Sequence, residues 1–425
     1  MENLNYVKKI LLISYNYAPE LTGIGKYNTE FCEYLVEESN HVEVITGFPY
    51  YPNWKLFKGY INFFYVNDEI NGVRIKRCPV YIPYKPTGLK RILMDFSFYW
   101  SSLFVLLNKL FFLKRYDIVF VPCPSFLMGF HILLLRIFWR KTKFIFHIQD
   151  LQIDAALELG LIKQPYLKKL LFKTEKFVLN NSSFVSTISE GMREKILFKS
   201  DQLKDVFVMP NWVDDNVIYS AKANISIISD LGIPLDKKIF FYSGSIGEKQ
   251  GIEVLLTIAP KLAILYPNLL FVISSSGPYK ELLQAEVLTN QISTILFIDL
   301  QPNNIFNHLL NYAHCHLVIQ KKQAADLLLP SKLSNILAVG ALSIITAEPI
   351  TSLFNIVQNN NLGLVIEPEN EFVLQETIQN VYANLISNQE SDKFNDIRNN
   401  AKNYAAKYLN KKLIINSFMK YVHEF

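Results

Sequence analysis

The stretch KKILLISYNYAPELTGIGKYNTEFCEYL (8–35) decides the fold, because in it a buried strand runs through a glycine turn into a helix. Residues 10–14 are strand-like, and Phe31, Tyr34 and Leu35 recur at helical spacing. Gly23 and Gly25 lie between them, where glycine lets backbone approach a ligand and a helix N-terminus favours an anion. Asn28 stands where a dinucleotide fingerprint needs a third glycine. The stretch predicts a phosphate or sugar loop, or else a plain tight turn.

The same alternation of strand and helix continues along the chain after this unit, and a second series of it begins after a linker. Short runs rich in β-branched or aromatic residues alternate with helical patterns, which predicts parallel sheets with helices on both faces. The expected strands are residues 10–14, 42–46, 118–121, 144–147 and 184–188, then 239–243, 270–274, 295–298, 316–320 and 343–346. We therefore expect an α/β chain of two Rossmann-like, doubly wound domains. They are residues 1–215 and 216–401, with a helix at about 402–425 packing back on the first.

Composition excludes a disordered chain and favours a reducing compartment. Half of the 425 residues are hydrophobic and 19% are charged. The four cysteines include no C-x-x-C pair, so neither a zinc ribbon nor a disulfide framework is implied. The apolar run after Lys8 and Lys9 is too short for a signal-peptide core, so we expect a cytoplasmic protein.

Charge and hydrophobicity point to a surface on the first domain. Residues 1–215 carry a net charge of +6 and the rest −1, which suggests either an anionic partner (lipid phosphate, a membrane surface or nucleic acid) or solvated surface charge. Residues 96–113 have one charge, Lys109, and reach the lower length limit for a membrane span. A buried helix, a helix dipping into a membrane face and a true span remain open. Basic residues flank this run and the shorter run 126–135, namely Lys114, Arg115, Arg136, Arg140, Lys141 and Lys143.

Two motifs in the second domain have the composition of a phosphate site. SGSIGEKQG (243–251) is a glycine-rich loop with one lysine, Lys249, and such a loop can hold a pyrophosphate. In LPSKL (329–333), Lys332 falls in the first turn of a helix, where the dipole disfavours a cation unless an anion lies between them. The alternatives are a simple turn and ordinary helix capping. The trio His314-Cys315-His316 is expected to be packing, and no metal is required.

The chain resembles retaining glycosyltransferases of the two-Rossmann-domain (GT-B) kind, in family 4. The similarity runs from end to end, and within the family it looks closest to the colanic-acid fucosyltransferase and related O-antigen or exopolysaccharide enzymes. It is carried by PELTGIGKY (19–27), HVEVITGFPYYP (41–52), FHIQD (146–150), STIS (186–189), PNW (210–212), YSGSIGEKQG (242–251) and AADLLLPSKLSNILAVG (324–340).

This resemblance implies roles for individual residues around a cleft between the domains. Gly23 and Gly25 would lie beside the transferred sugar, and His147 would face it as a catalytic residue, although a strand-end histidine is often a core polar group. Lys249 and Lys332 would be catalytic through the donor phosphates. The remaining donor-binding candidates are Gly244, Ser245, Ser331, Leu333 and Asn335, and the acceptor-side candidates are Tyr50, Tyr51, Trp54 and Asp150.

Two departures from the family pattern concern the donor. Ser245 stands where the family has an arginine, and Leu327 and Asn335 stand where it has paired glutamates. We expect Lys332 to supply the second phosphate cation, and the Asn335 carbonyl oxygen could still accept ribose hydroxyls. The resemblance implies sugar transfer with retention, possibly of fucose, from a GDP- or UDP-sugar to a lipid-linked acceptor. We expect no cofactor and no metal, since lysines can neutralise the phosphates, and we expect no nucleic-acid partner. The basic charge and apolar runs of residues 1–215 predict a peripheral location on the inner face of the cytoplasmic membrane. A nucleotide-sugar epimerase of the same fold and a non-catalytic sugar- or nucleotide-binding protein are the alternatives.

Overall fold

The computed structural model describes residues 7–20, 23–123, 125–151, 153–154, 164–244, 246–247, 250–322, 330–349, 351–387 and 392–424. The chain forms two compact α/β units. Unit 1 comprises Met1–Pro210 together with Ser417–Phe425, and unit 2 comprises Asn211–Asn416. The division therefore falls after residue 210, five residues before the boundary expected from the sequence.

Unit 1 is built on a sheet whose strand order, in the described residues, is β3-β4-β2-β1-β5-β6-β7-β8. All neighbours are parallel except β3 and β4. The strands are β1 (Lys9–Ile13), β2 (His41–Thr46), β3 (Val66–Ile70), β4 (Val73–Arg77), β5 (Ile118–Cys123), β6 (Lys143–Ile148), β7 (Phe184–Thr187) and β8 (Phe207–Val208). Each of the five strands expected here is present, and β3, β4 and β8 are additional.

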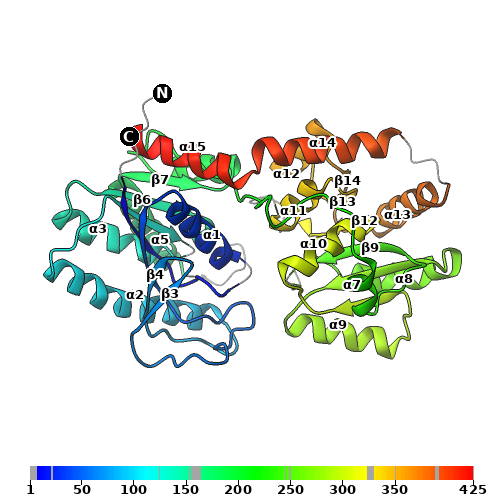
Figure 1. The fold of residues 1–425 in the computed structure, drawn as a ribbon, viewed down its shortest axis with the longest axis horizontal. Coiled ribbons are helices and arrows are strands. Elements are labelled where there is room, and N and C mark those ends of the chain that lie inside the picture. The colour runs from blue at the N-terminus through cyan, green and yellow to red at the C-terminus, as the bar shows by residue number, and fades with distance from the viewer. Residues whose placement is uncertain are drawn as a thin grey trace. The chain divides into compact units, whose positions relative to one another are not determined.

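The helices of unit 1 lie on the faces of this sheet (Figure 1). They are α1 (Gly23–Glu37), α2 (Gly88–Phe111), α3 (Gly129–Phe138), α5 (Pro165–Asn181), α6 (Glu190–Lys199) and, from Ser417 onward, α15 (Lys411–Glu424), with a 3₁₀ turn, η1, at Phe126–Met128. On α15, the Phe418 ring lies 5.7 Å from the Phe120 ring of β5 and 6.1 Å from the Phe31 ring of α1. The C-terminal helix therefore completes the aromatic core of unit 1.

Unit 2 repeats the architecture with the strand order β11-β10-β9-β12-β13-β14, all parallel. Its strands are β9 (Lys238–Ser243), β10 (Leu269–Ser274), β11 (Ile295–Ile298), β12 (Cys315–Val318), β13 (Ser343–Thr346) and β14 (Leu364–Ile366). Its helices are α7 (Ile225–Asp230), α8 (Val254–Leu265), α9 (Pro278–Thr289), α10 (Asn303–Tyr312), α11 (Ser331–Val339), α12 (Ser352–Asn360), α13 (Glu371–Ile386) and α14 (Asp392–Tyr408). The five strands expected in this domain are present, and β14 is additional.

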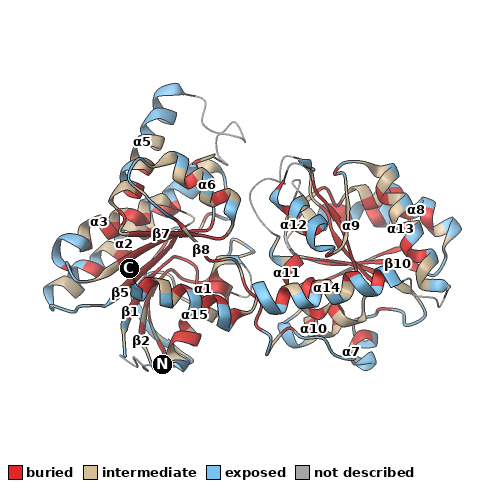
Figure 2. Ribbon diagram, turned by 90° about the horizontal axis from the view of Figure 1, so that it is seen from above, coloured by how far each residue is buried: buried red, intermediate tan, exposed pale blue. Residues whose placement is uncertain are grey.

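Alternate residues of these strands fill two cores, as the side-chain alternation of a strand requires. Phe240 and Tyr242 belong to the core under α8 and α13, whereas Ile239 and Phe241 pack with α7 and α10 on the other face. Figure 2 shows the buried residues concentrated along both sheets. The single C-terminal helix expected at about 402–425 is in fact two helices, because α14 ends at Tyr408 and α15 begins at Lys411.

Helix α2 is longer than the apolar run that predicted it, and only its inner side is buried. Met94, Phe98 and Leu106 face the core, while Trp100 and Phe111 are 64% and 81% exposed. The fully buried helix considered from the sequence is therefore wrong for its outer side. Among the described residues, no helix combines the length and the apolarity needed to cross a membrane.

Candidate active site

Each sheet has one point where the strand order reverses. In open parallel sheets, ligands bind beside the carboxyl ends of the strands at such a point. In unit 1 it lies between β1 and β5, and in unit 2 between β9 and β12. Most residues singled out from the sequence follow the carboxyl ends of these or neighbouring strands: Gly23, Gly25, Tyr50, Tyr51, Trp54 and Asp150 in unit 1, and Gly244, Ser331, Lys332, Leu333 and Asn335 in unit 2.

Lys332 is the central residue of the unit 2 site. Its Nζ atom is buried, lies 3.8 Å from the centre of the Tyr242 ring, and has no hydrogen-bond partner among the described residues. Burial lowers the pKa of Lys332 to about 7, because an unpaired ammonium is poorly solvated there. A buried cation without a counter-charge is costly, so the position suits an anionic ligand.

The surroundings of Lys332 are those of an anion site. Lys332 belongs to the first turn of α11, whose N-terminus has no side-chain cap, and uncapped N–H groups favour a negative charge. Gly244 follows β9 with a φ of 122°, which favours glycine, and a Cβ there would lie 3.7 Å from Lys332 Nζ. At the same sheet edge, Ser275 Oγ, Ser276 Oγ and Gln320 Nε2 are buried without hydrogen-bond partners in the described part of the chain.

The other donor-side candidates are only partly placed. Leu333 is buried in the core of unit 2, Ser331 is exposed, and Asn335 is half-buried one turn further along α11. Leu333 therefore packs the helix onto its unit. Ser245, Lys249 and Leu327 lie outside the described residues.

In unit 1 the glycine loop is organised by Glu20, a residue that the sequence analysis did not single out. Glu20 is 3% exposed, and its Oε1 accepts from the backbone N–H groups of Tyr50 and Tyr51, each at 3.0 Å. Its Oε2 accepts from Asn16 Nδ2 at 2.8 Å. A Cβ on Gly25 would lie 2.7 Å from Glu20 Oε2, so glycine is required there for close approach. Glu20 thereby ties the loops after β1 and β2 together.

The acceptor-side candidates of unit 1 differ in exposure. Tyr50 is buried, with its ring 5.3 Å from that of Trp54, while Tyr51 and Trp54 are half-buried. The Arg91 guanidinium lies over the Trp54 ring at 5.1 Å. Asp150 is exposed just beyond β6. Tyr51, Trp54 and Asp150 are thus at least partly accessible, whereas Tyr50 is buried against Trp54.

His147 lies inside β6 rather than in a loop. It is 1% exposed, its Nδ1 is 2.9 Å from Ser186 Oγ, and its ring stacks on Phe120. Burial lowers the pKa of His147 to about 3, so the ring is neutral at pH 7. These are the surroundings of a core histidine, and the catalytic role expected from the resemblance stays a prediction.

A second carboxyl group, Asp95, was also not singled out. It lies on the inner side of α2, and burial raises its pKa to about 7 against the opposing effects of Ser125 and Arg91. It is the single acidic residue of α2, and a lone carboxyl group in so apolar a helix is a sequence feature that could have identified it as a candidate. Perturbed carboxyl groups beside a switch point are functional candidates.

The histidine trio has a structural explanation. His314 Nδ1 accepts from the Ile239 N–H at 3.1 Å, and His316 Nε2 lies 3.0 Å from the Leu310 carbonyl oxygen. Within the described residues, no three His, Cys, Asp or Glu side chains are grouped so that they could hold a metal ion.

Comparison with known proteins identifies both units. Residues 22–212 match the family described as "Glycosyl transferase 4-like domain", and residues 224–405 match "Glycosyl transferases group 1". An Escherichia coli K12 protein named as a colanic acid biosynthesis glycosyl transferase, WcaI, is 38% identical over 368 residues, which are 85% of this chain and 89% of the relative. The chain belongs to the family 4 glycosyltransferases. The epimerase and the non-catalytic binding protein are thereby set aside.

Solved structures share the GT-B fold of this glycosyltransferase. Sucrose-phosphate synthase from Thermosynechococcus elongatus matches with a TM-score of 0.74 and 15% identity, over 98% of both chains. The Anabaena protein HepE in complex with UDP-glucose matches with a TM-score of 0.67 and 11% identity, over 98% of this chain and 100% of that one. These likenesses confirm two Rossmann-like domains of the GT-B type.

Proposed function

We propose that this glycosyltransferase moves a sugar, with retention, from a nucleoside-diphosphate donor to a lipid-linked oligosaccharide in surface polysaccharide biosynthesis. The pathway follows the name of the 38% identical relative, which is a colanic acid biosynthesis glycosyl transferase. A nucleotide-sugar donor is consistent with the HepE structure, which shares this fold and was solved in complex with UDP-glucose. GDP-fucose is our preferred donor because of the motif resemblance, with UDP-sugars as the alternative.

The main support for this proposal is the Lys332 ammonium at the N-terminus of α11, which has no hydrogen-bond partner in the described part of the chain. A diphosphate there would accept from Lys332 and from the first N–H groups of the helix, beside Gly244. We propose that Lys249, in the glycine-rich motif that follows β9 in the sequence, supplies a second cation. These groups would stabilise the charge that develops on the leaving diphosphate.

The proposed transfer needs no further reactant. The acceptor hydroxyl oxygen bonds to the anomeric carbon as the bond from that carbon to the diphosphate oxygen breaks, on the same face of the sugar. The hydroxyl proton passes to the leaving diphosphate. Tyr51, Trp54 and Asp150 would contact the acceptor, and His147 would support β6 through Ser186 and Phe120.

We further propose that the transferase works as a peripheral protein on the inner face of the cytoplasmic membrane, where a lipid-linked acceptor is held. The +6 charge of residues 1–215 supports this location. Two of the basic residues that flank the apolar runs also stabilise helix ends. Arg136 donates to the Asn181 carbonyl oxygen at the end of α5, and Lys143 donates to the Val422 carbonyl oxygen near the end of α15. Neutralising them would weaken those helix ends as well as any membrane contact.

A thermal-shift comparison of GDP, UDP and their sugars tests the donor. If GDP-fucose is the donor, GDP and GDP-fucose should raise the Tm of the protein and UDP should have little effect on it. Incubation with GDP-fucose and membrane-extracted lipid-linked oligosaccharide should then give a product whose anomeric configuration matches the donor by NMR. An inverted product would refute retention, and turnover only with UDP-sugars would refute the GDP assignment.

A further inference from the structure

Helix α2 carries an apolar face that stays largely exposed among the described residues. Six large side chains recur at intervals of three or four residues along it: Leu93, Phe96, Trp100, Phe104, Leu107 and Phe111. Residues at these intervals lie on one side of a helix. We call these six residues the α2 outer face. A surface helix normally turns such a stripe toward the core, so an exposed stripe marks an interaction surface.

A neighbouring segment extends this surface. Ile61, Phe63 and Phe64 are exposed just before β3. Tyr65 fixes the segment to the helix, because its hydroxyl donates to the Ser101 carbonyl oxygen at 3.1 Å and its ring lies 5.8 Å from that of Phe104. The apolar area therefore spans the helix and the chain entering the β3–β4 hairpin.

The charges along α2 and at its two ends are mainly basic. Between Tyr84 and Arg115 there are six basic residues and a single acidic one, Asp95, which is buried. Lys90 and Arg91 lie near one end of the α2 outer face, and Lys114 and Arg115 just past the other. Two copies of the chain joined through this face would bring these cations together, which disfavours a homodimer. An apolar helix face bordered by Lys and Arg is typical of a helix that lies in the interface of an anionic membrane.

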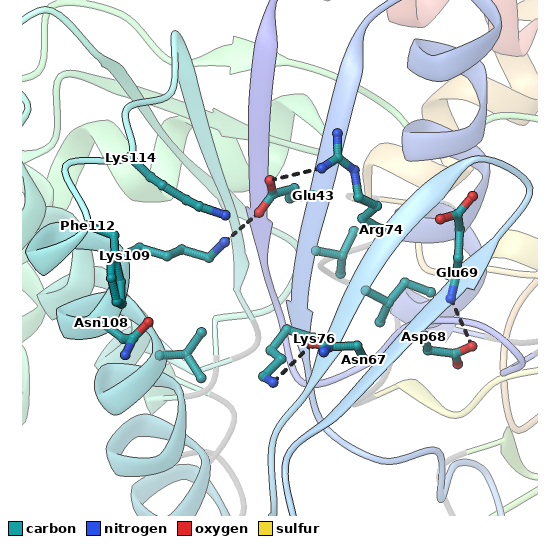
Figure 3. Close-up of a pocket in the computed structure, with 13 residues that line it drawn as sticks. Glu43, Asn67, Asp68, Glu69, Arg74, Lys76, Asn108, Lys109, Phe112 and Lys114 are labelled. Atoms are coloured by element: carbon teal, nitrogen blue, oxygen red, sulfur yellow. Dashed lines mark hydrogen bonds and ion pairs between the residues drawn. The ribbon is translucent and has the colours of Figure 1, made fainter.

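A groove of about 610 Å³ opens at the C-terminal end of the same helix (Figure 3). It lies between α2 and the strands β2, β3 and β4. Its lining holds four cations and three carboxylates: Arg74, Lys76, Lys109 and Lys114, and Glu43, Asp68 and Glu69. Asp68 is paired with Arg77. Lys109 donates to Glu43, Arg74 lies 4.0 Å from Glu43, and Lys76 donates to Asn67. Lys114 extends into the groove, as Figure 3 shows, and its side chain makes no hydrogen bond or ion pair within the described residues, although its backbone N–H donates to the Lys109 carbonyl oxygen.

We propose that the α2 outer face docks on an anionic phospholipid bilayer and that the groove holds the phosphate of one phospholipid headgroup, with Lys114 as its principal cation. The proposal rests on the membrane location proposed above and gives that location a surface and a lipid site. The groove is lined from the middle of β2 and β4, away from their carboxyl ends, where the sugar chemistry is placed. A headgroup in it would leave the acceptor side of unit 1 open.

Sedimentation with vesicles tests the surface. The full-length protein should bind vesicles of phosphatidylcholine and phosphatidylglycerol in equal parts more strongly than vesicles of phosphatidylcholine alone, and salt should weaken this binding. Trp100 fluorescence should shift to the blue on binding, and Trp100→Phe should abolish the shift while binding remains. The proposal would be overturned if the wild-type protein stays in the supernatant with both kinds of vesicle. It would also be overturned if the protein elutes from size exclusion as a dimer whose interface is the α2 outer face.

Two adjacent cations test the headgroup site. Lys114 lines the groove and Arg115 does not, yet both are exposed, so Lys114→Gln and Arg115→Gln remove equal charge. Diffuse attraction predicts the same loss for both, about fivefold per charge. A bound phosphate predicts a clearly larger loss for Lys114→Gln, which persists at high salt, while Lys204→Gln at the opposite sheet edge changes little. Equal losses would reject the groove as a lipid site.

Nucleotide stabilisation measured without vesicles separates this proposal from the proposed function. It should be the same in the wild type and in all of these variants. If the variants bind nucleotide normally but the vesicle results fail, the docking proposal is wrong and the transferase assignment stands. If the wild-type protein binds vesicles but is stabilised by no nucleotide, the donor proposal fails alone.

Discussion

The Nζ atom of Lys332 lies 3.8 Å from the centre of the Tyr242 ring, and no acceptor among the described residues bonds to it. The face of an aromatic ring attracts a cation but does not replace a hydrogen-bond acceptor. The arrangement therefore places a lysine where it is only partly stabilised until an anion arrives. Gly244, on the loop after β9, leaves room for that anion beside the ammonium.

Removing this cation should cost activity and not stability. Lys332→Ala is expected to lower kcat/KM for sugar transfer by about two to three orders of magnitude, as for loss of one electrostatic contact to the transition state. Its Tm should be unchanged or higher, because a buried unpaired charge has been removed. Lys261→Ala, which removes an exposed lysine paired with Glu371, is the matched control. Full activity of Lys332→Ala would exclude the assigned site.

Lys249 gives a parallel prediction from sequence alone. Lys249→Ala should reduce transfer by a similar factor if its loop holds the same diphosphate. The double variant with Lys332→Ala should lose less than the product of the two single effects, because both contacts serve one group. Strictly multiplicative losses in kcat/KM would place the two lysines at independent sites.

Gly25 and Glu20 should behave as a coupled pair. Gly25→Ala puts a Cβ 2.7 Å from Glu20 Oε2, so we expect a loss of stability, measured by urea unfolding. Glu20→Ala leaves two buried donors, the Tyr50 N–H and Asn16 Nδ2, without this acceptor, at roughly 1–3 kcal/mol each, and the partly buried Tyr51 N–H as well. In the Glu20→Ala background, Gly25→Ala should cost less than in the wild type, because Oε2 is gone, but it should still destabilise, because the Cβ of residue 20 remains 2.9 Å from the new Cβ. Additive free energies of unfolding would contradict this contact.

His147→Ala separates packing from catalysis. Because the ring is buried and bonded to Ser186, we expect a loss of about 2–4 kcal/mol of stability. The kcat of the folded fraction should fall less than about tenfold, below the range typical of a general acid or base. Ser186→Ala is the companion variant, which breaks the same hydrogen bond without touching the ring. An unchanged Tm with a large loss of kcat would instead restore His147 to the catalytic residues.

The sequence predicted the parallel strands well, because each is a short apolar run between helical patterns. It missed the β3–β4 hairpin, whose strands are polar on their exposed side. Asn71 and Gly72 join them with φ values of 49° and 78°, and an Asn-Gly pair is a strong signal for a two-residue hairpin turn. The Asn71-Gly72 pair therefore predicts the hairpin at the edge of the sheet, which lines one side of the groove.

Residues of the candidate site could be predicted only where the sequence departs from a local structural preference. Lys332 could be found because a cation in the first turn of a helix opposes the dipole. Glu20 lay inside a quoted motif, but its function depends on Tyr50 and Tyr51, thirty residues away, which no local pattern shows. The exposure of the α2 outer face could not be read from the sequence either, since helical periodicity does not say which side meets the core.

The pH dependence of donor binding follows from the Lys332 pKa of about 7. Below pH 7 the unliganded amine is already protonated, so the Kd of an intact nucleotide sugar should be constant. Above pH 7 the amine is neutral, and the anionic donor raises its pKa by favouring the charged form, so binding must take up a proton. The Kd should therefore rise by up to about tenfold per pH unit above pH 7, until the pKa of Lys332 in the complex is reached.

Intact nucleotide sugar must be the ligand in this measurement, because the terminal phosphate of a free nucleoside diphosphate would itself titrate, near a pKa of about 6. Calorimetry between pH 6 and 9 in buffers of different ionisation enthalpy would report the proton uptake directly. Lys332→Arg keeps a fixed charge and should bind without this pH dependence. If the wild-type Kd is flat across the range, or if the dependence survives in Lys332→Arg, then Lys332 does not face the diphosphate.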